Sequence, residues 1–155
     1  MQRQPGVELH GDVVWLMLSM LTRVKHVGET AAVLRTTEQA LSYRDLAPSI
    51  LRQRLVVEGT RAEPIDASEI RAYLKALSGV CDMTVLIEPV THRSDRFGWA
   101  GWVHWETSGA HFYAWDEPFV FFSVDIYTCK AFDTHEAVEF TRSFLGADEV
   151  VAREF

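Results

Sequence analysis

Cysteine, basic charge and long apolar runs are all scarce in this sequence of 155 residues, and each scarcity excludes a class of protein. The two cysteines, Cys81 and Cys129, are too few for a disulfide framework and are typical of a reducing cytoplasm. Lys and Arg number 15 against 22 Asp and Glu, so a net charge of −7 argues against a nucleic-acid partner. The apolar run from Val13 to Leu21 is too short to span a bilayer. We therefore expect a cytoplasmic protein without a membrane or nucleic-acid partner.

Short metal-ligand spacings of the H-x-H or C-x-x-C kind are also missing. His104 and His111 lie on neighbouring strand-like segments, and with Cys129 they form the best combination for zinc. Spacing is what makes such motifs specific, so we predict no metal site.

What remains is the composition of a globular protein, with 48% apolar and 24% charged residues. The pattern changes near Pro48. Before it, two helices are predicted, over residues 13–27 and 29–46, with Asp12 as a cap and Gly28 as a stop. We predict that residues 1–50 form an N-terminal helical extension and residues 51–155 a separate domain.

The predicted domain alternates strands and helices. Strands are expected at 52–59, 83–90, 98–107, 119–129 and 148–155, with "HFYAW" (111–115) either continuing the third or beginning another. Capping boxes at Asp66 and Asp133 begin two helices, which Gly79 and Gly146 end. The largely apolar 119–129 segment predicts burial on both faces or a subunit interface. The order β-α-β-β-β-β-α-β predicts an α+β two-layer sandwich, with an antiparallel or mixed sheet and helices on one face.

One strand-like stretch contains a small break, "WETSGAHFYAW" (105–115), with Ser108 between Thr107 and Gly109. A β-bulge is the structural interpretation favoured by this stretch alone. The aromatic rings around it suit a core. A flat ring such as Trp115 and a carboxylate such as Glu106 would also suit a ligand with a planar base and a positive charge.

A second stretch, "DIYTCK" (125–130), ends the long apolar strand with Cys129 next to Lys130. A cysteine beside a cation can act as a proton donor or nucleophile, although a small buried hydrophobe is the commoner role.

Together these residues resemble the small prokaryotic S-adenosylmethionine decarboxylases over about residues 52–155. That family carries a V-D-[IV]-[FY]-T-C-G run, and residues 124–130 read V-D-I-Y-T-C-K, with only the final Gly replaced. The family's serine segment, E-S-H-x-S-I-H-T-[WY]-P-E, is similar to "TSGAHFYAWDE" when Ser108 is set on the motif serine. One extra residue then precedes Cys129.

The resemblance implies a chemistry. In that family the serine attacks the preceding carbonyl, the chain splits, and the serine becomes an N-terminal pyruvoyl group that forms a Schiff base with the substrate. A cysteine then returns a proton. The resemblance thus implies that Ser108 is the cleavage serine and the source of a pyruvoyl cofactor. It also implies that Cys129 is the proton donor.

The match is uneven at the remaining positions. Thr107 stands where the family has Glu, Gly109 where it has His, His111 where it has Ser, and Tyr113 where it has the processing His. His111 and Tyr113 lie two residues apart on one strand face, so His111 is a candidate for the missing role, with Tyr113 assisting. Glu106 and Trp115 are the candidate substrate-binding residues.

Three functions remain open on this evidence. The first is pyruvoyl-dependent decarboxylation of S-adenosylmethionine for spermidine and other polyamine synthesis, by a homodimer as in the family. The second is the same chemistry on ornithine or arginine. The third is an uncleaved homologue that binds a ligand or regulates a partner, as the altered positions 107 and 113 suggest.

Overall fold

The computed structural model describes residues 44–155, and those from Ala47 onward form one compact unit. The predicted helix over 13–27 lies outside the described residues. The second predicted helix also lies outside them except for residues 44–46, which are not helical, so that helix does not extend to its expected end. The division of the chain at residues 50 and 51 stays a prediction.

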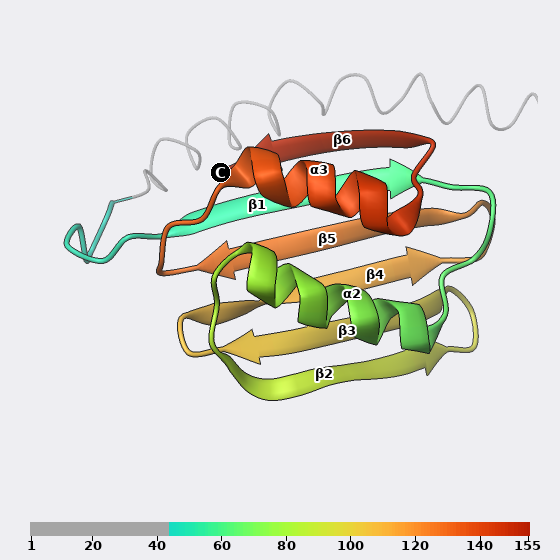
Figure 1. Cartoon of the computed structure of the whole chain (residues 1–155), viewed down its shortest axis with the longest axis horizontal. Helices are drawn as coiled ribbons and strands as arrows, with labels where there is room; N and C mark the ends of the chain where they lie inside the picture. Colours follow the sequence, from blue (N-terminus) through green and yellow to red (C-terminus); the bar gives the residue numbers. More distant parts are fainter. Residues whose placement is uncertain (1–43) are drawn as a thin grey trace, which may run out of the picture. The chain divides into compact units, whose positions relative to one another are not determined.

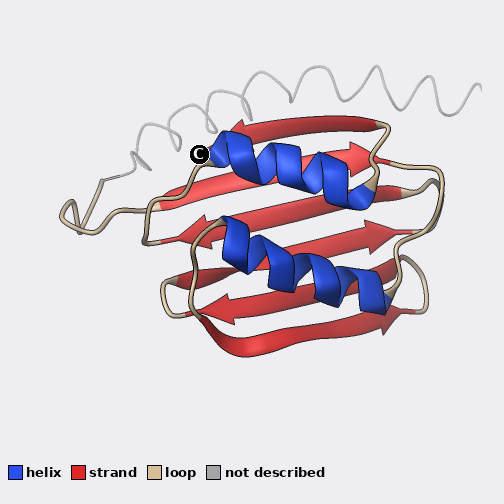
Figure 2. Ribbon diagram, viewed as in Figure 1, coloured by secondary structure: helices blue, strands red, loops and turns tan. Residues whose placement is uncertain are grey.

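Six strands and two helices make up this unit. They follow in the order β1 (Gln53–Thr60), α2 (Ala67–Val80), β2 (Val85–Ser94), β3 (Gly98–Trp105), β4 (Ser108–Trp115), β5 (Phe121–Thr128), α3 (Thr134–Leu145) and β6 (Glu149–Glu154). The strands form one antiparallel sheet in the order β2-β3-β4-β5-β1-β6. Both helices cover the same face of this sheet (Figures 1 and 2), so the predicted two-layer α+β architecture is confirmed.

Both helices begin where their caps predict. The Asp66 carboxylate accepts hydrogen bonds from the backbone N–H groups of Ser68 and Glu69, which satisfies donors that the first helical turn leaves free. Asp133 does the same for Glu136, and Gly146 ends α3 in the left-handed conformation that glycine adopts most easily. Gly79 does not end α2, which continues to Val80.

The core lies between the helices and the sheet. Along β4 and β5 every second side chain is buried, and this alternation places Phe112, Phe122, Val124 and Ile126 beneath the helices. β5 was expected to be buried on both faces or to form a subunit interface. Within this chain only one face is buried, and the outward side chains are partly or well exposed, as Tyr127 is at 42%. We call the sheet surface opposite α2 and α3 the open face, because no described helix covers it.

The stretch around Ser108 differs from its expected form. Residues 106 and 107 form a turn, and β4 begins at Ser108, which pairs with Trp105. Pairing then continues without interruption through Gly109 and His104, so the predicted β-bulge at Ser108 is wrong. The register shifts of this sheet lie instead between β2 and β3. The small residues therefore begin a strand after a tight turn.

Candidate active site

The candidate site lies where the β3–β4 turn meets the end of β5. Ser108 pairs with Thr128, the last residue of β5, so Cys129 comes next to the turn. The backbone N–H of Cys129 donates a hydrogen bond of 2.9 Å to the carbonyl oxygen of Thr107. The hydroxyl oxygen of Ser108 lies 3.7 Å from the Cys129 sulfur. The structure thus brings together the two residues that the sequence singled out from separate motifs.

The backbone at Ser108 is held in an unusual conformation, with φ of 132°. Residues with a side chain rarely adopt this region, and such strain costs about 1–3 kcal/mol wherever the surroundings impose it. The strained angle is the rotation about the N–Cα bond of Ser108. This bond adjoins the Thr107–Ser108 peptide bond, whose carbonyl Cys129 contacts.

Side chains behind the turn hold Thr107 in place. The Thr107 hydroxyl donates a hydrogen bond to the Met83 sulfur at 3.2 Å. The Thr128 hydroxyl lies 3.3 Å from the Thr107 hydroxyl. The Thr128 hydroxyl also accepts a 3.0 Å hydrogen bond from the Lys130 backbone N–H. Thr128 is fully buried, so these contacts anchor both the turn and the segment that carries Cys129.

Lys130 follows Cys129, but its ammonium is bound by Asp82, through both the carboxylate and the backbone carbonyl. The hydrogen bond and the positive charge of Lys130 lower the pKa of the Asp82 carboxyl. This ion pair joins the end of β5 to the segment that follows α2.

A pocket of about 210 Å³ opens on the open face beside Ser108. His104 and His111 line it from β3 and β4, and Asp125 and Tyr127 line it from β5. The Asp125 carboxylate is held by two hydrogen bonds from the Arg54 guanidinium, of 2.8 and 2.7 Å. This pairing raises the pKa of Arg54 and fixes Asp125 opposite His111.

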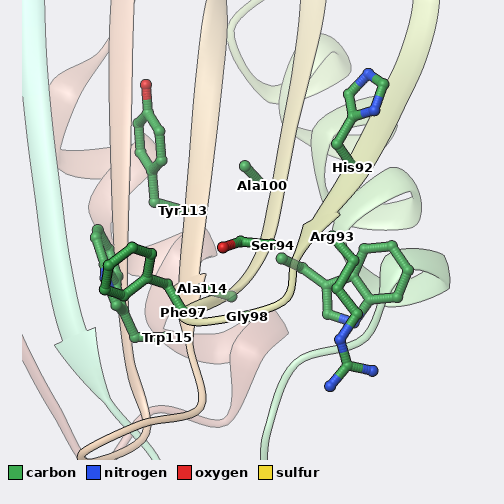
Figure 3. A pocket seen from close by; sticks show the side chains of 10 residues that line it. His92, Arg93, Ser94, Phe97, Gly98, Ala100, Tyr113, Ala114 and Trp115 are labelled. Carbon is green, nitrogen blue, oxygen red and sulfur yellow. The ribbon is translucent and has the colours of Figure 1, made fainter.

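The other predicted site residues are placed differently. Glu106 lies in the turn immediately before Thr107. Tyr113 and Trp115 line a second pocket, of about 300 Å³, where β4 ends (Figure 3). Trp115 is seven residues from Ser108 along one strand, which is about 23 Å. Ser108 and His111 thus line one pocket, and Cys129 lies beside Ser108. Tyr113 and Trp115 line the other pocket, although the Tyr113 ring is 6.2 Å from the His111 ring.

Sequence reasoning missed Asp125 and Tyr127, and considered His104 only as a zinc ligand. Strand alternation was the available signal, because His104, His111 and Asp125 occupy outward positions on three neighbouring strands. Among residues 44–155 no group of three or more His, Cys, Asp or Glu side chains is arranged to hold a metal ion.

The comparisons with known proteins identify the family and the fold. The family model described as S-adenosylmethionine decarboxylase matches residues 53–155, and the chain belongs to that family. Among solved structures, the crystal structure of the adenosylmethionine decarboxylase from Aquifex aeolicus VF5 is similar in fold. Its TM-score is 0.57 at 17% identity, over 68% of this chain and 89% of that one. Among curated proteins, none matches this chain.

In the described part of the chain, no helix is long and apolar enough to cross a membrane.

Proposed function

We propose that the protein is a pyruvoyl-dependent decarboxylase of S-adenosylmethionine that forms its own cofactor by cleaving the bond between Thr107 and Ser108. The position of Cys129 is the observation that carries this proposal. Its N–H contacts the Thr107 carbonyl and its sulfur lies against the Ser108 hydroxyl, so one residue faces both reacting groups of a self-cleavage.

The same contacts suit the cleavage chemistry. Attack of the Ser108 oxygen on the Thr107 carbonyl places negative charge on the carbonyl oxygen. A backbone N–H already aimed at that oxygen stabilises the charge as it develops. Relief of the positive φ at Ser108 favours the same step, because breaking the peptide bond frees the residue from its strained conformation.

The residues around Ser108 also fit the group that cleavage would leave there. A pyruvoyl group at residue 108 would supply an electron sink for the loss of carbon dioxide from an amino acid. The Cys129 thiol, 3.7 Å from the Ser108 oxygen, is placed to hold and return a proton at that position. The pocket lined by His111 and Asp125 opens beside it and would receive the substrate.

The proposed substrate and pathway rest on family membership. The proposed homodimer rests on family membership and on the exposed aromatic residues of the open face. S-adenosylmethionine as substrate places the activity in polyamine synthesis, with spermidine as the expected end product. A homodimer is expected to cover the open face, and the partner copy would enlarge a pocket that alone is small for a nucleoside substrate. Two free cysteines agree with a cytoplasmic location.

Mass spectrometry of the denatured protein tests the cleavage directly. We expect fragments 1–107 and 108–155 in place of the intact 17.6 kDa chain, with a pyruvoyl group at the new terminus. Ser108→Ala should remain intact. Cys129→Ala should lose decarboxylation even if it is cleaved. An intact wild-type chain would refute the proposal and favour an uncleaved ligand-binding homologue.

The substrate is tested separately, by release of labelled carbon dioxide from S-adenosylmethionine, ornithine and arginine. Release from S-adenosylmethionine alone supports the proposal. Release from ornithine or arginine alone would retain the chemistry and correct the substrate.

A further inference from the structure

Two imidazoles line the pocket beside Ser108, those of His104 on β3 and His111 on β4. Both residues are exposed, and within residues 44–155 neither imidazole forms a hydrogen bond or ion pair. The His111 ring lies 6.2 Å from the Tyr113 ring. The ring nitrogens of both histidines are thus available for proton transfer, which histidine performs near neutral pH more readily than other side chains.

Strand register places the backbone of His104 nearer to Ser108 than the backbone of His111. Ser108 pairs with Trp105, so His104 is one residue from the position directly across the sheet from Ser108. His111 is three residues from Ser108 along the same strand, which is about 10 Å. Tyr113, the residue at the family's histidine position, does not line this pocket.

Gly109 packs closely against the strand that carries His104. Gly109 is the cross-strand partner of His104, and on this face it presents no side chain to the imidazole. A Cβ atom at residue 109 would lie 2.4 Å from the carbonyl oxygen of Val103, so the position requires glycine. His104, Ser108 and Gly109 all line the same pocket.

We propose that His104 carries the proton in the first step of self-cleavage, an inference that rests on the proposed function. His104 accepts the proton of the Ser108 hydroxyl as the oxygen bonds to the Thr107 carbonyl carbon. The bond between that carbon and the Ser108 nitrogen then breaks, and His104 gives the proton to the nitrogen. The product is an ester with a free amine, formed without any co-reactant. His111 remains the candidate for later removal of the Ser108 α-proton.

The test compares His104→Gln, His111→Gln and wild type in fresh protein from cell-free synthesis. His135→Gln, an exposed histidine of α3, is the control for loss of an imidazole far from the pocket. Cleavage is followed by mass spectrometry with and without hydroxylamine, which cuts an ester at residue 108 but leaves the amide intact. Thermal unfolding of each variant confirms that it is folded.

His104→Gln should slow cleavage about 10²–10⁴-fold, the usual contribution of general acid–base catalysis. The uncleaved chain should resist hydroxylamine because no ester has formed. Free imidazole should restore cleavage of His104→Ala, which a structural role would not explain. His135→Gln should cleave as wild type does.

Two results would overturn the role of His104 while leaving the proposed function intact. One is cleavage of His104→Gln at the wild-type rate, and the other is accumulation of an ester in His104→Gln. If His111→Gln instead remains a hydroxylamine-resistant amide while His104→Gln is cleaved, the proton carrier is His111. An intact wild-type chain would overturn the proposed function, and this inference with it.

Discussion

The two cysteines differ in burial, and this difference should set their reactivity. Cys81 is 2% exposed, and desolvation, with a smaller contribution from Glu136, raises its pKa to about 12. Cys129 is exposed beside Ser108. Only a thiolate reacts with alkylating agents, so the buried thiol should be inert at neutral and mildly alkaline pH.

Iodoacetamide at pH 8 should therefore add one group to the folded protein and two after denaturation. The added group should be on Cys129, as peptide mass mapping would show. In the matched pair, folded Cys129→Ser should gain no group and folded Cys81→Ser should gain one. Rapid labelling of Cys81 in the folded wild type would contradict the packing described for it.

At the scale of elements, one buried hydrogen bond joins the two helices. The Tyr73 hydroxyl of α2 donates to the Thr141 hydroxyl of α3 at 2.7 Å, and Thr141 in turn donates to the Ala137 carbonyl. Both side chains are fully buried. Removing the Tyr73 hydroxyl and removing the Thr141 hydroxyl should lower the free energy of unfolding by different amounts. Only the loss of the Thr141 hydroxyl leaves a buried polar group without a partner.

Tyr73→Phe should lower the free energy of unfolding by about 1 kcal/mol, since Thr141 keeps its bond to Ala137. Thr141→Val should cost more, about 1–3 kcal/mol, because the Tyr73 hydroxyl is then buried and unpaired. Urea unfolding of both variants and of the double variant measures the coupling. The double variant should cost less than the sum of the single changes, and strict additivity would show that the bond contributes nothing.

Most elements could be predicted from the sequence because their signals are local. The Asp66 and Asp133 caps and the alternation along β4 and β5 need only neighbouring residues. The role of Ser108 as the first residue of a strand could not be predicted, because a tight turn and a bulge both favour small residues and only the pairing with Trp105 distinguishes them.

Part of the candidate site could be predicted from local sequence motifs, and part depends on how the strands pair. The family motifs supply Ser108 and Cys129, while their contact depends on the pairing of β4 with β5. His104 has no motif, and its place beside Gly109 depends on the register between two strands. Register is a property of the folded sheet, so His104 could not be singled out for this role from the sequence. His111 and Tyr113 follow from the family motif and remain predictions.

At the scale of the whole molecule, the sheet has one covered face and one open face. Tyr113 and Tyr127 stand on the open face with 41% and 42% of their surfaces exposed, and Val151 of β6 is 56% exposed. Large apolar and aromatic side chains exposed on one face can mark a contact between proteins. The homodimer proposed above would bury this face.

A charge placed at the centre of the open face should therefore separate the dimer without unfolding the chain. Ser123 lies on this face between Glu58 of β1 and Tyr113 of β4, so an arginine there has an acidic neighbour within its own chain. We expect sedimentation velocity to give twice the 17.6 kDa chain mass for wild type and a single chain mass for Ser123→Arg. Glu139→Arg, which adds positive charge to exposed α3, should remain dimeric. A wild-type protein that sediments as a monomer at micromolar concentration would show that the open face has another use, because the sheet would then present its aromatic residues to solvent or to a different partner.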